Sequence, residues 1–273
     1  MTATRPRVMG VVNITPDSFS DGGRFLGAEA AIAYARQLVA QGADILDIGG
    51  ESTRPGAAPV KAEEEIGRIL PVLRALKGSG AVLSIDTMKP EVMRAAAAEG
   101  ATLWNDVTSL SYSPSSLEAA AAIGCEVMLM HMRGEPRTMQ DNPVYEDVVG
   151  EVCAFLRDRA EAAMAAGVKR EAIWLDPGIG FGKTLEHNLE LLAHLDRVRV
   201  LGFKTVLGVS RKRFLRAIDT TAVEATDRLG GSLAGALIGA EAGMDAVRVH
   251  DVRETLQALT TWAAVRARRP APP

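Results

Sequence analysis

Residues 81–106, AVLSIDTMKPEVMRAAAAEGATLWND, contain a complete strand–helix–strand pattern. Two short apolar runs, 81–86 and 102–106, flank a segment of helical period at 90–99. Neither run alternates cleanly between apolar and polar residues, which is typical of strands covered on both faces in a parallel sheet. Gly100 follows the helical segment, where a left-handed cap would let the chain turn into the second strand. The stretch therefore predicts one β/α unit of a parallel sheet.

The same pattern recurs along the whole chain. The predicted strands are 7–13, 44–48, 81–86, 102–106, 126–131, 172–176, 204–210 and 245–250. The predicted helices are 29–41, 62–77, 90–99, 115–123, 144–166, 186–198, 229–242 and 252–266. Eight such pairs in 273 residues predict an α/β fold, a single (β/α)8 TIM barrel over 1–273, with its core at about 8–265 and a frayed tail at 266–273. The open dinucleotide-binding sheet is disfavoured because no GxGxxG follows the first strand.

Composition limits the classes of function. The chain is 47% hydrophobic and has a net charge of −3, which argues against a nucleic-acid partner because phosphates require a basic face. No apolar stretch reaches about 18 residues, and residues 1–7 lack the apolar core of a secretion signal. We therefore expect no membrane partner, a cytoplasmic location and small-molecule substrates.

Almost every predicted strand stops at a side chain that can hydrogen-bond, carry charge or ligate. These side chains are Asn13, Asp47, Asp86, Asn105, His131, Asp176, Ser210, Arg248 and His250. A closed barrel would bring them to one end, and that end carries the chemistry in barrel enzymes. The sequence therefore predicts an active site at the carboxyl ends of the strands.

Familiar local motifs do not explain these residues. The glycine-rich segment 178–184 is similar to a nucleotide phosphate loop, but Pro177 stands where the first glycine is required. Segments 208–212 and 230–234 each lack the last glycine of a nucleophile elbow. The four histidines show no zinc spacing.

Longer motifs are more specific. MGVVNITPDSFSDGG spans 9–23, DIGGESTRPG spans 47–56 and LDPGIGFGK spans 175–183, and shorter ones are SIDT at 84–87, WNDV at 104–107, MHMRG at 130–134, GVSRK at 208–212 and VRVH at 247–250. In this order, over about 8–265, they resemble the dihydropteroate synthases. The resemblance implies a transferase of folate biosynthesis that condenses 6-hydroxymethyl-7,8-dihydropterin diphosphate with p-aminobenzoate, giving 7,8-dihydropteroate and diphosphate. It also implies Mg2+ as cofactor, sulfonamide inhibition and a homodimer.

The pterin ring explains one group of residues. A pterin presents adjacent N–H donors on one edge and accepting ring nitrogens, so its site needs a carboxylate, an amide and a cation around one plane. Asp176, Asn105 and Lys212 supply these. By resemblance, Asp86 completes the pterin pocket and stabilises the cation left when diphosphate departs, in an SN1-like step. The plane of Arg248 would lie on the pterin, and we assign catalytic roles to Asp86, Lys212 and Arg248.

The leaving diphosphate requires a second set. Arg248 and His250 lie two residues apart on one predicted strand, so their side chains point the same way, and Asn13 ends the adjoining strand. The family pattern implies that Arg248, His250 and Arg54 bind the diphosphate, and that Asn13 binds it and holds the magnesium ion. An amide oxygen suits that ion, which keeps several waters.

The p-aminobenzoate pocket is assigned by resemblance alone. It comprises Phe19, Thr53, Pro55, Phe181, Ser210 and the stem of Lys212. Segments 15–25 and 51–59 are rich in glycine and serine, and we expect them to act as lids over the diphosphate.

Several interpretations remain open. Asp47 and Asp106 are interpreted as helix caps or contacts to loop backbone, and His131 fits a structural role as well as a ligand contact. A methyltetrahydrofolate–corrinoid methyltransferase-like domain and a non-catalytic pterin-binding relative are the alternative functions. The small residues of 233–243 suit a dimer interface or contacts within the barrel.

Overall fold

The computed structural model describes residues 5–14, 23–52, 59–134 and 138–268, in which eight parallel strands close a barrel in sequence order. The strands are β1 (Arg7–Asn13), β2 (Ile45–Gly49), β3 (Val82–Asp86), β4 (Leu103–Asp106), β5 (Glu126–Met130), β6 (Ile173–Asp176), β7 (Lys204–Leu207) and β8 (Ala246–Val249). The predicted (β/α)8 barrel is confirmed. β7 stops at Leu207, earlier than predicted, and residues 208–212 form a loop at the barrel mouth.

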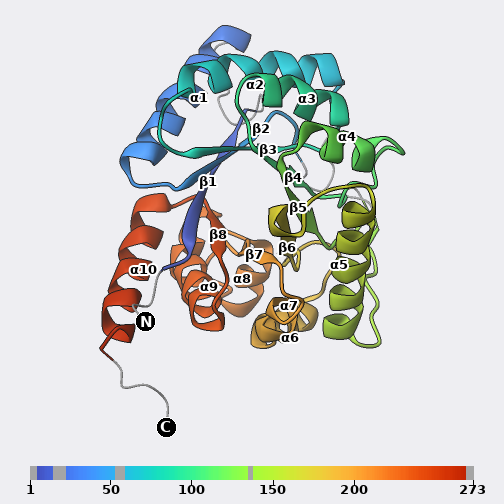
Figure 1. The fold of residues 1–273 in the computed structure, drawn as a ribbon. Coiled ribbons are helices and arrows are strands. Elements are labelled where there is room, and N and C mark those ends of the chain that lie inside the picture. Colours follow the sequence, from blue (N-terminus) through green and yellow to red (C-terminus); the bar gives the residue numbers. More distant parts are fainter. Residues whose placement is uncertain (1–4, 15–22, 53–58, 135–137, 269–273) are drawn as a thin grey trace.

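Helices surround the barrel (Figure 1). They are α1 (Gly23–Ala40), α2 (Ala62–Leu76), α3 (Pro90–Ala98), α4 (Ser116–Ile123), α5 (Val148–Ala165), α6 (Leu185–Ala193), α7 (Leu195–Arg199), α8 (Arg213–Ile218), α9 (Leu229–Ala242) and α10 (Val252–Arg266). Two short 3-10 turns, η2 (Arg170–Ala172) and η3 (Thr226–Arg228), precede β6 and α9. The α9 and α10 bounds match the prediction.

Four helical segments differ from the prediction. α1 begins at Gly23, six residues before the predicted start at residue 29. The segment predicted as one helix at 186–198 divides into α6 and α7, because His194 leaves the helical backbone with φ −123° and ψ 35°. α5 begins only at Val148, where the Asp147 side chain accepts a hydrogen bond from the Gly150 N–H as an N-cap. α8 was not predicted, since six residues are too few to show a helical period.

The helix ends explain how the chain returns to the barrel. Gly124 and Gly243, which follow α4 and α9, have φ values of 70° and 77°, in the left-handed region that favours glycine. Gly42, Gly100 and Gly167 also have positive φ, so the glycine cap predicted at Gly100 is confirmed and the other helix ends follow the same pattern.

The barrel interior determines where the site lies. A small apolar cluster fills it with one side chain from each of seven strands, namely Met9, Ile45, Leu103, Met128, Trp174, Val206 and Ala246, and Val82 of β3 packs against them. Alternate residues of a strand face the same side, so residues two positions further along face the interior one level higher. That next level contains Asp47, Asn105, Asp176, Gly208 and Arg248. The polar residues of the predicted site thus rest directly on the interior core.

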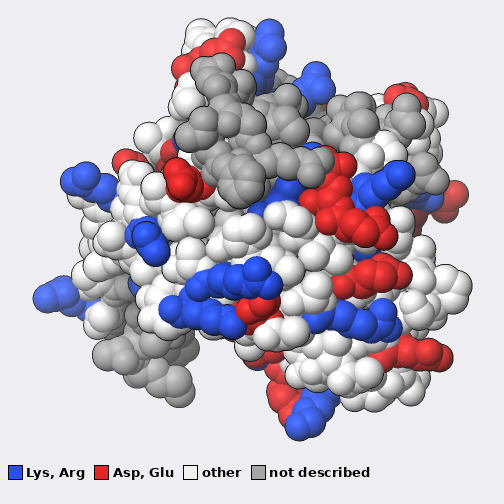
Figure 2. Space-filling model, turned by 90° about the horizontal axis from the view of Figure 1, so that it is seen from above, with Lys and Arg blue, Asp and Glu red and all other residues white. Residues whose placement is uncertain are grey.

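The surface carries charges of both signs. On the face shown in Figure 2, Lys and Arg side chains lie next to Asp and Glu side chains. Among the residues that the structure describes, no helix has the length and apolar character needed to cross a lipid bilayer.

Candidate active site

The strand registers link four residues near the carboxyl ends of the first four strands. In the parallel registers Asn13 pairs with Gly49, Gly49 with Asp86, and Asp86 with Asn105. A Cβ atom added to Gly49 would lie 3.4 Å from Asp86 Cβ and 3.7 Å from Asn13 Oδ1. Asn13 and Asp86 are therefore both close neighbours of Gly49, at ordinary van der Waals distance from where a Cβ would lie.

Asp47 is the centre of a buried network beside these residues. Its Oδ2 accepts hydrogen bonds from Arg248 Nε at 2.6 Å and Asn105 Nδ2 at 3.0 Å, and its Oδ1 accepts from Ser84 Oγ at 2.7 Å. Arg248 Nη2 also donates to Asp86 Oδ2 at 2.7 Å. Burial opposes the guanidinium charge, but Asp47 and Asp86 outweigh it and raise the pKa of Arg248 above its ordinary value. Arg248 is therefore a fixed cation held by two carboxylates.

The two carboxylate oxygens of Asp86 differ in their hydrogen bonding. Oδ2 pairs with Arg248, whereas Oδ1 is buried and has no hydrogen-bond partner within the described residues. Burial and, to a smaller extent, the charge of Asp47 raise the pKa of Asp86 to about 7, against the opposing effect of Arg248. A buried acceptor without a partner is rare in folded proteins, so this oxygen is a strong candidate for contact with a bound molecule.

A second group surrounds Gly208. A Cβ atom on this residue would lie 3.9 Å from Arg248 Cβ, 3.9 Å from Lys212 Nζ and 4.0 Å from Asp176 Oδ2. Burial raises the pKa of Asp176 and lowers that of Lys212 to about 8, and each charge partly offsets the effect on the other. Asp176 and Arg248 therefore belong to one site rather than to opposite rims of the barrel.

The loop after β6 brings Phe181 to this group. Lys212 Nζ donates to the Ile179 carbonyl and lies 4.4 Å from the centroid of the Phe181 ring. Asp176 Oδ1 accepts from the Gly178 N–H at 2.7 Å. Gly178 has φ +66°, and a Cβ there would lie 1.9 Å from the His131 carbonyl oxygen. The glycine thus allows the loop to pass close over the end of β5.

Lys183 holds the loop after β6 in place through hydrogen bonds to its backbone. Its buried ammonium donates to the carbonyls of Gly178 and Phe181 at 3.0 Å each and of His131 at 3.3 Å, and lies 2.9 Å from His131 Nδ1. Burial and, to a smaller extent, the charge of Lys183 lower the pKa of His131 to about 3, so the imidazole is neutral at physiological pH. His131 is here a partner of Lys183, which favours its structural interpretation.

His250 and Ser210 are in direct contact. Ser210 Oγ accepts a hydrogen bond from the His250 N–H at 3.1 Å and lies 3.1 Å from His250 Nδ1. His250 was assigned to the diphosphate and Ser210 to p-aminobenzoate. The two predicted subsites therefore adjoin between the ends of β7 and β8.

Comparisons with known proteins agree on one family. The sequence model described as "Pterin binding enzyme" matches residues 9–250. The dihydropteroate synthase of Escherichia coli K12 is 46% identical over 257 residues, covering 94% of this chain and 90% of that protein. The chain belongs to the dihydropteroate synthase family of pterin-binding enzymes.

Solved structures of the family have the same fold. The Xanthomonas albilineans dihydropteroate synthase with 4-aminobenzoic acid has a TM-score of 0.91 and 48% identity, covering 99% of this chain and 96% of that one. Another structure of that enzyme is in complex with 7,8-dihydropteroate. The Yersinia pestis dihydropteroate synthase in a sulfonamide drug complex has a TM-score of 0.91 and 43% identity, covering 98% and 96%.

Part of the predicted site lies outside the described residues, namely Phe19, Thr53, Arg54 and Pro55. The chain on both sides of 53–58 is well anchored. Glu51 Oε1 accepts from the Val60 N–H at 2.9 Å, and Lys89 Nζ donates to Glu51 and, at 2.7 Å, to Glu65. This buried cluster fixes the two ends of the segment that carries the family's Ser-Thr-Arg-Pro motif.

Two interpretations of strand-end aspartates have different outcomes. Asp106 accepts from the Thr108 and Leu110 N–H groups, so its predicted contact to loop backbone is confirmed. The same interpretation of Asp47 is wrong, because its carboxylate accepts from three side chains. The sequence feature that could have identified Asp47 as a site residue was its position near a strand end inside the DIGGESTRPG motif. Lys183 was also missed, although it ends the LDPGIGFGK motif.

Proposed function

We propose that the chain catalyses the reaction of its family, joining 6-hydroxymethyl-7,8-dihydropterin diphosphate to p-aminobenzoate to give 7,8-dihydropteroate and diphosphate in folate biosynthesis. The observation that carries this proposal is the convergence of Asp176, Lys212 and Arg248 around Gly208 at the mouth of the barrel. The relatives solved with 4-aminobenzoic acid and 7,8-dihydropteroate support the same chemistry.

The pterin ring is held by its polar edges. Asp176 accepts hydrogen bonds from the 2-amino and N3 positions, and Lys212 donates to the 4-oxo and N5 side. Asn105 contacts ring nitrogens with an amide whose orientation is fixed by its bond to Asp47. Each charge-assisted hydrogen bond contributes about 1.5–3 kcal/mol. An analogue lacking these groups would leave buried polar atoms unpaired, so discrimination should be steep.

The chemical step separates charge. The bond between the exocyclic methylene carbon and the diphosphate oxygen breaks with both electrons leaving on the oxygen, and a cation spreads over the pterin. Asp86 supports the rest of the reaction: its carboxylate is fixed by Arg248, and its buried Oδ1 offers negative charge to the cation as it forms. The amino nitrogen of p-aminobenzoate then bonds to the methylene carbon and loses a proton.

The departing diphosphate is bound by Asn13, Arg54, Arg248 and His250. Nowhere in the described parts of the chain do three or more His, Cys, Asp and Glu side chains gather to hold a metal ion. Asn13 Oδ1, which lies beside Gly49 near Asp86, nevertheless fits magnesium, which takes few protein ligands and completes its shell with water and phosphate oxygens. When bound there, magnesium would neutralise charge on the diphosphate.

The p-aminobenzoate site adjoins the pterin site. Phe181 and the stem of Lys212 form one wall, with the ammonium 4.4 Å from the ring centroid. Ser210 lies at the other side, against His250. Phe19, Thr53 and Pro55 complete the pocket in the proposal. We expect a sulfonamide to occupy the same place as p-aminobenzoate; the Yersinia pestis relative was solved in a sulfonamide drug complex.

Release of diphosphate tests the function. Purified protein with magnesium and the dihydropterin diphosphate should release diphosphate only when p-aminobenzoate is added, and a sulfonamide should inhibit the release. Pterin binding without turnover would contradict the proposal and favour the non-catalytic relative. Methyl transfer from methyltetrahydrofolate to a corrinoid would favour the alternative methyltransferase.

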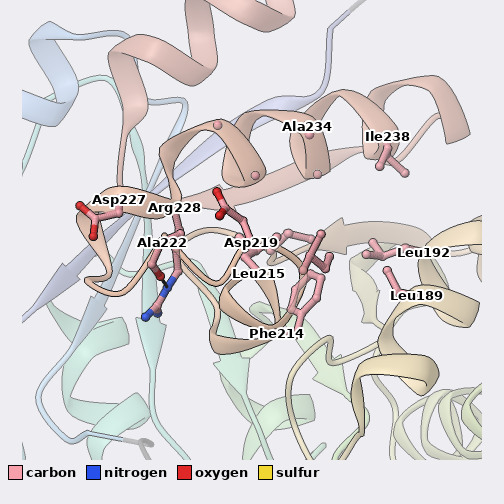
Figure 3. Close-up of a pocket in the computed structure, with 15 residues that line it drawn as sticks. Leu189, Leu192, Phe214, Leu215, Asp219, Ala222, Asp227, Arg228, Ala234 and Ile238 are labelled. Atoms are coloured by element: carbon pink, nitrogen blue, oxygen red, sulfur yellow. Dashed lines mark hydrogen bonds between the residues drawn. The ribbon is translucent and has the colours of Figure 1, made fainter.

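We also propose a homodimer in the cytoplasm. A groove of about 280 Å³ between α6, α8 and α9 is flanked by Leu189 and Ile238, which are 43% and 44% exposed (Figure 3). Exposed apolar side chains around a groove favour a partner surface, and a second copy would bury both at once. Both cysteines, Cys125 and Cys153, are free thiols, as suits a reducing compartment. Sedimentation of the purified protein and fractionation of cells test the two points.

A further inference from the structure

Arg211 has an unusual backbone conformation for an arginine. Its φ is +58°, and of the residues described only Ser109 and Leu110 share positive φ without being glycine. A side chain with a Cβ in this region carries strain, which persists only where the surroundings enforce it. Arg211 stands between Ser210 and Lys212, two residues of the candidate active site. The strain is therefore at a functional position.

Arg228, the last residue of η3, and Ser232, in the first turn of α9, hold the backbone of Arg211. Its N–H donates to Ser232 Oγ at 2.9 Å, and its carbonyl accepts from Arg228 Nη1 at 3.0 Å. Ser232 Oγ in turn donates to the Arg228 carbonyl at 2.8 Å. Both backbone hydrogen-bonding groups of the strained residue are thus bound by one structural unit, which we call the Arg228–Ser232 clamp.

The clamp is buried and anchored. Arg228 is 8% exposed and also donates to the carbonyls of Ala222 at 3.2 Å and Val223 at 2.6 Å; Figure 3 shows it beside Ala222. A guanidinium that donates to carbonyls of two separate segments joins them rigidly, because its five N–H groups have fixed directions. The clamp therefore connects the loop at 208–212 after β7, called the β7 loop, to the chain that precedes α9.

Glycines in α9 bring this helix close to the β7 loop. A Cβ on Gly235 would lie 2.5 Å from Val209 Cγ1, and one on Gly231 would lie 2.9 Å from Leu215 Cδ2. These two glycines allow close contacts within the barrel. Such contacts are one of the two interpretations given above for the small residues at 233–243 and their neighbours. The close approach is what allows a short serine side chain to reach the Arg211 N–H.

The side chain of Arg211 points away from the clamp toward the end of β8. Nε and Nη2 donate to the two Asp251 oxygens at 3.0 and 2.5 Å. Asp251 follows His250, which contacts Ser210. The left-handed turn thus sends Arg211 to β8 while its two neighbours face the barrel mouth.

We propose that Arg228 and Ser232 are positioning residues that hold Arg211 in its left-handed conformation and so present Ser210 and Lys212 together to the substrates. The inference rests on the proposed function, since that function gives Ser210 and Lys212 their ligands. Neither clamp residue contacts the substrates; both act through the Arg211 peptide.

Kinetics of Arg228→Lys and Ser232→Ala test the clamp. A lysine or an alanine cannot keep the Arg211 peptide in place, and small displacements at an active site are costly, so kcat/KM for p-aminobenzoate should fall about tenfold or more. Arg159→Lys is the matched control, because Arg159 donates to the carbonyls of the other strained pair, Ser109 and Leu110, at 2.9 and 3.2 Å. The control should lose a similar amount of thermal stability with little change in kcat/KM.

Arg211→Gly separates positioning from general stability. Glycine adopts positive φ without strain, so the effect of Arg228→Lys on kcat/KM should shrink in the Arg211→Gly background, and the two changes should not be additive. Additive effects, or a loss of kcat/KM in the clamp variants no larger than in Arg159→Lys, would overturn the proposal.

A measurement without turnover separates this proposal from the proposed function. NMR titration of Lys212 in the free protein should give a higher pKa in Arg228→Lys than in the parent, because a displaced loop exposes the ammonium to water. An unchanged titration counts against the clamp. Lack of diphosphate release by the parent protein would instead refute the function and leave the clamp to be judged by the titration.

Discussion

Asp47→Asn is the most informative single change in this site. The substitution keeps the shape of the side chain and removes its charge. Asp47 is wholly buried, and its carboxylate accepts from Ser84, Asn105 and Arg248. In the variant, an NH2 group that replaces Oδ1 can donate to the Ser84 hydroxyl, which also accepts, so the main change is loss of the negative charge that faces Arg248.

The size of the effect follows from the ion pair with Arg248. Removing one partner of a buried salt bridge typically costs about 3–5 kcal/mol. Asp86 remains to pair with Arg248 Nη2, so we expect a loss near the lower end, about 3 kcal/mol of unfolding free energy. Displacement of Arg248 and Asn105 should also lower kcat/KM by about a hundredfold.

The pH profile gives a second, independent signature. Asp86 must be ionised to stabilise the cation, so activity falls as pH drops through its pKa of about 7. The negative charge of Asp47 is one cause that raises this pKa. In Asp47→Asn the acid limb of kcat/KM should therefore move below about pH 7.

Urea unfolding and pH–rate profiles measure both effects. Ser84→Ala is the control, because it removes one neutral hydrogen bond to Asp47 and leaves the charge; it should cost about 1 kcal/mol and leave the acid limb in place. If Asp47→Asn behaved like Ser84→Ala in both measurements, the role of Asp47 as the charged centre of the network would be refuted.

Four further predictions concern other parts of the site. Asp86→Ala should lower kcat by an amount equivalent to about 2.7–4 kcal/mol, and near-normal turnover would exclude its role at the cation. The alkaline limb of the rate profile should lie near the Lys212 pKa of about 8, because proton loss above it removes the cation; a rate that stays flat well above that pH would contradict this. Gly178→Ala should destabilise the fold by about 3 kcal/mol or more in urea, since a Cβ would lie 1.9 Å from the His131 carbonyl oxygen, whereas Gly67→Ala on the open face of α2 should stabilise it by about 0.5–1 kcal/mol. Chelation should abolish turnover and magnesium should restore it; no recovery on adding the metal would count against an ion at Asn13.

The strand and helix order was predictable because each unit repeats the same physical pattern. Buried strands read as short apolar runs, and glycines such as Gly243 mark where helices must turn back. What the sequence did not show was local geometry. The break at His194 and the short helix α8 depend on packing between neighbouring units, and neither produces a periodic signal.

The site was predictable to the extent that it lies at strand ends. Asp86, Asn105, Asp176 and Arg248 face one opening because the register of parallel strands brings their ends together. The role of Asp47 was not predictable from local sequence, since its partner Arg248 lies 201 residues away and the two meet only in the closed barrel. The clamp on Arg211 is of the same kind: a left-handed arginine leaves no mark in the sequence.

The ion pairs of Arg248 reach from the last strand to β2 and β3. They therefore join the first part of the polypeptide to its last strand. A fragment ending after β4 would keep two buried aspartates without their counter-ion, and the remaining fragment would keep the arginine alone, so each half should be unstable by itself and should attract the other. Ring closure during folding and assembly of the reactive centre are thus a single event, and substitutions that tune one will be felt by the other.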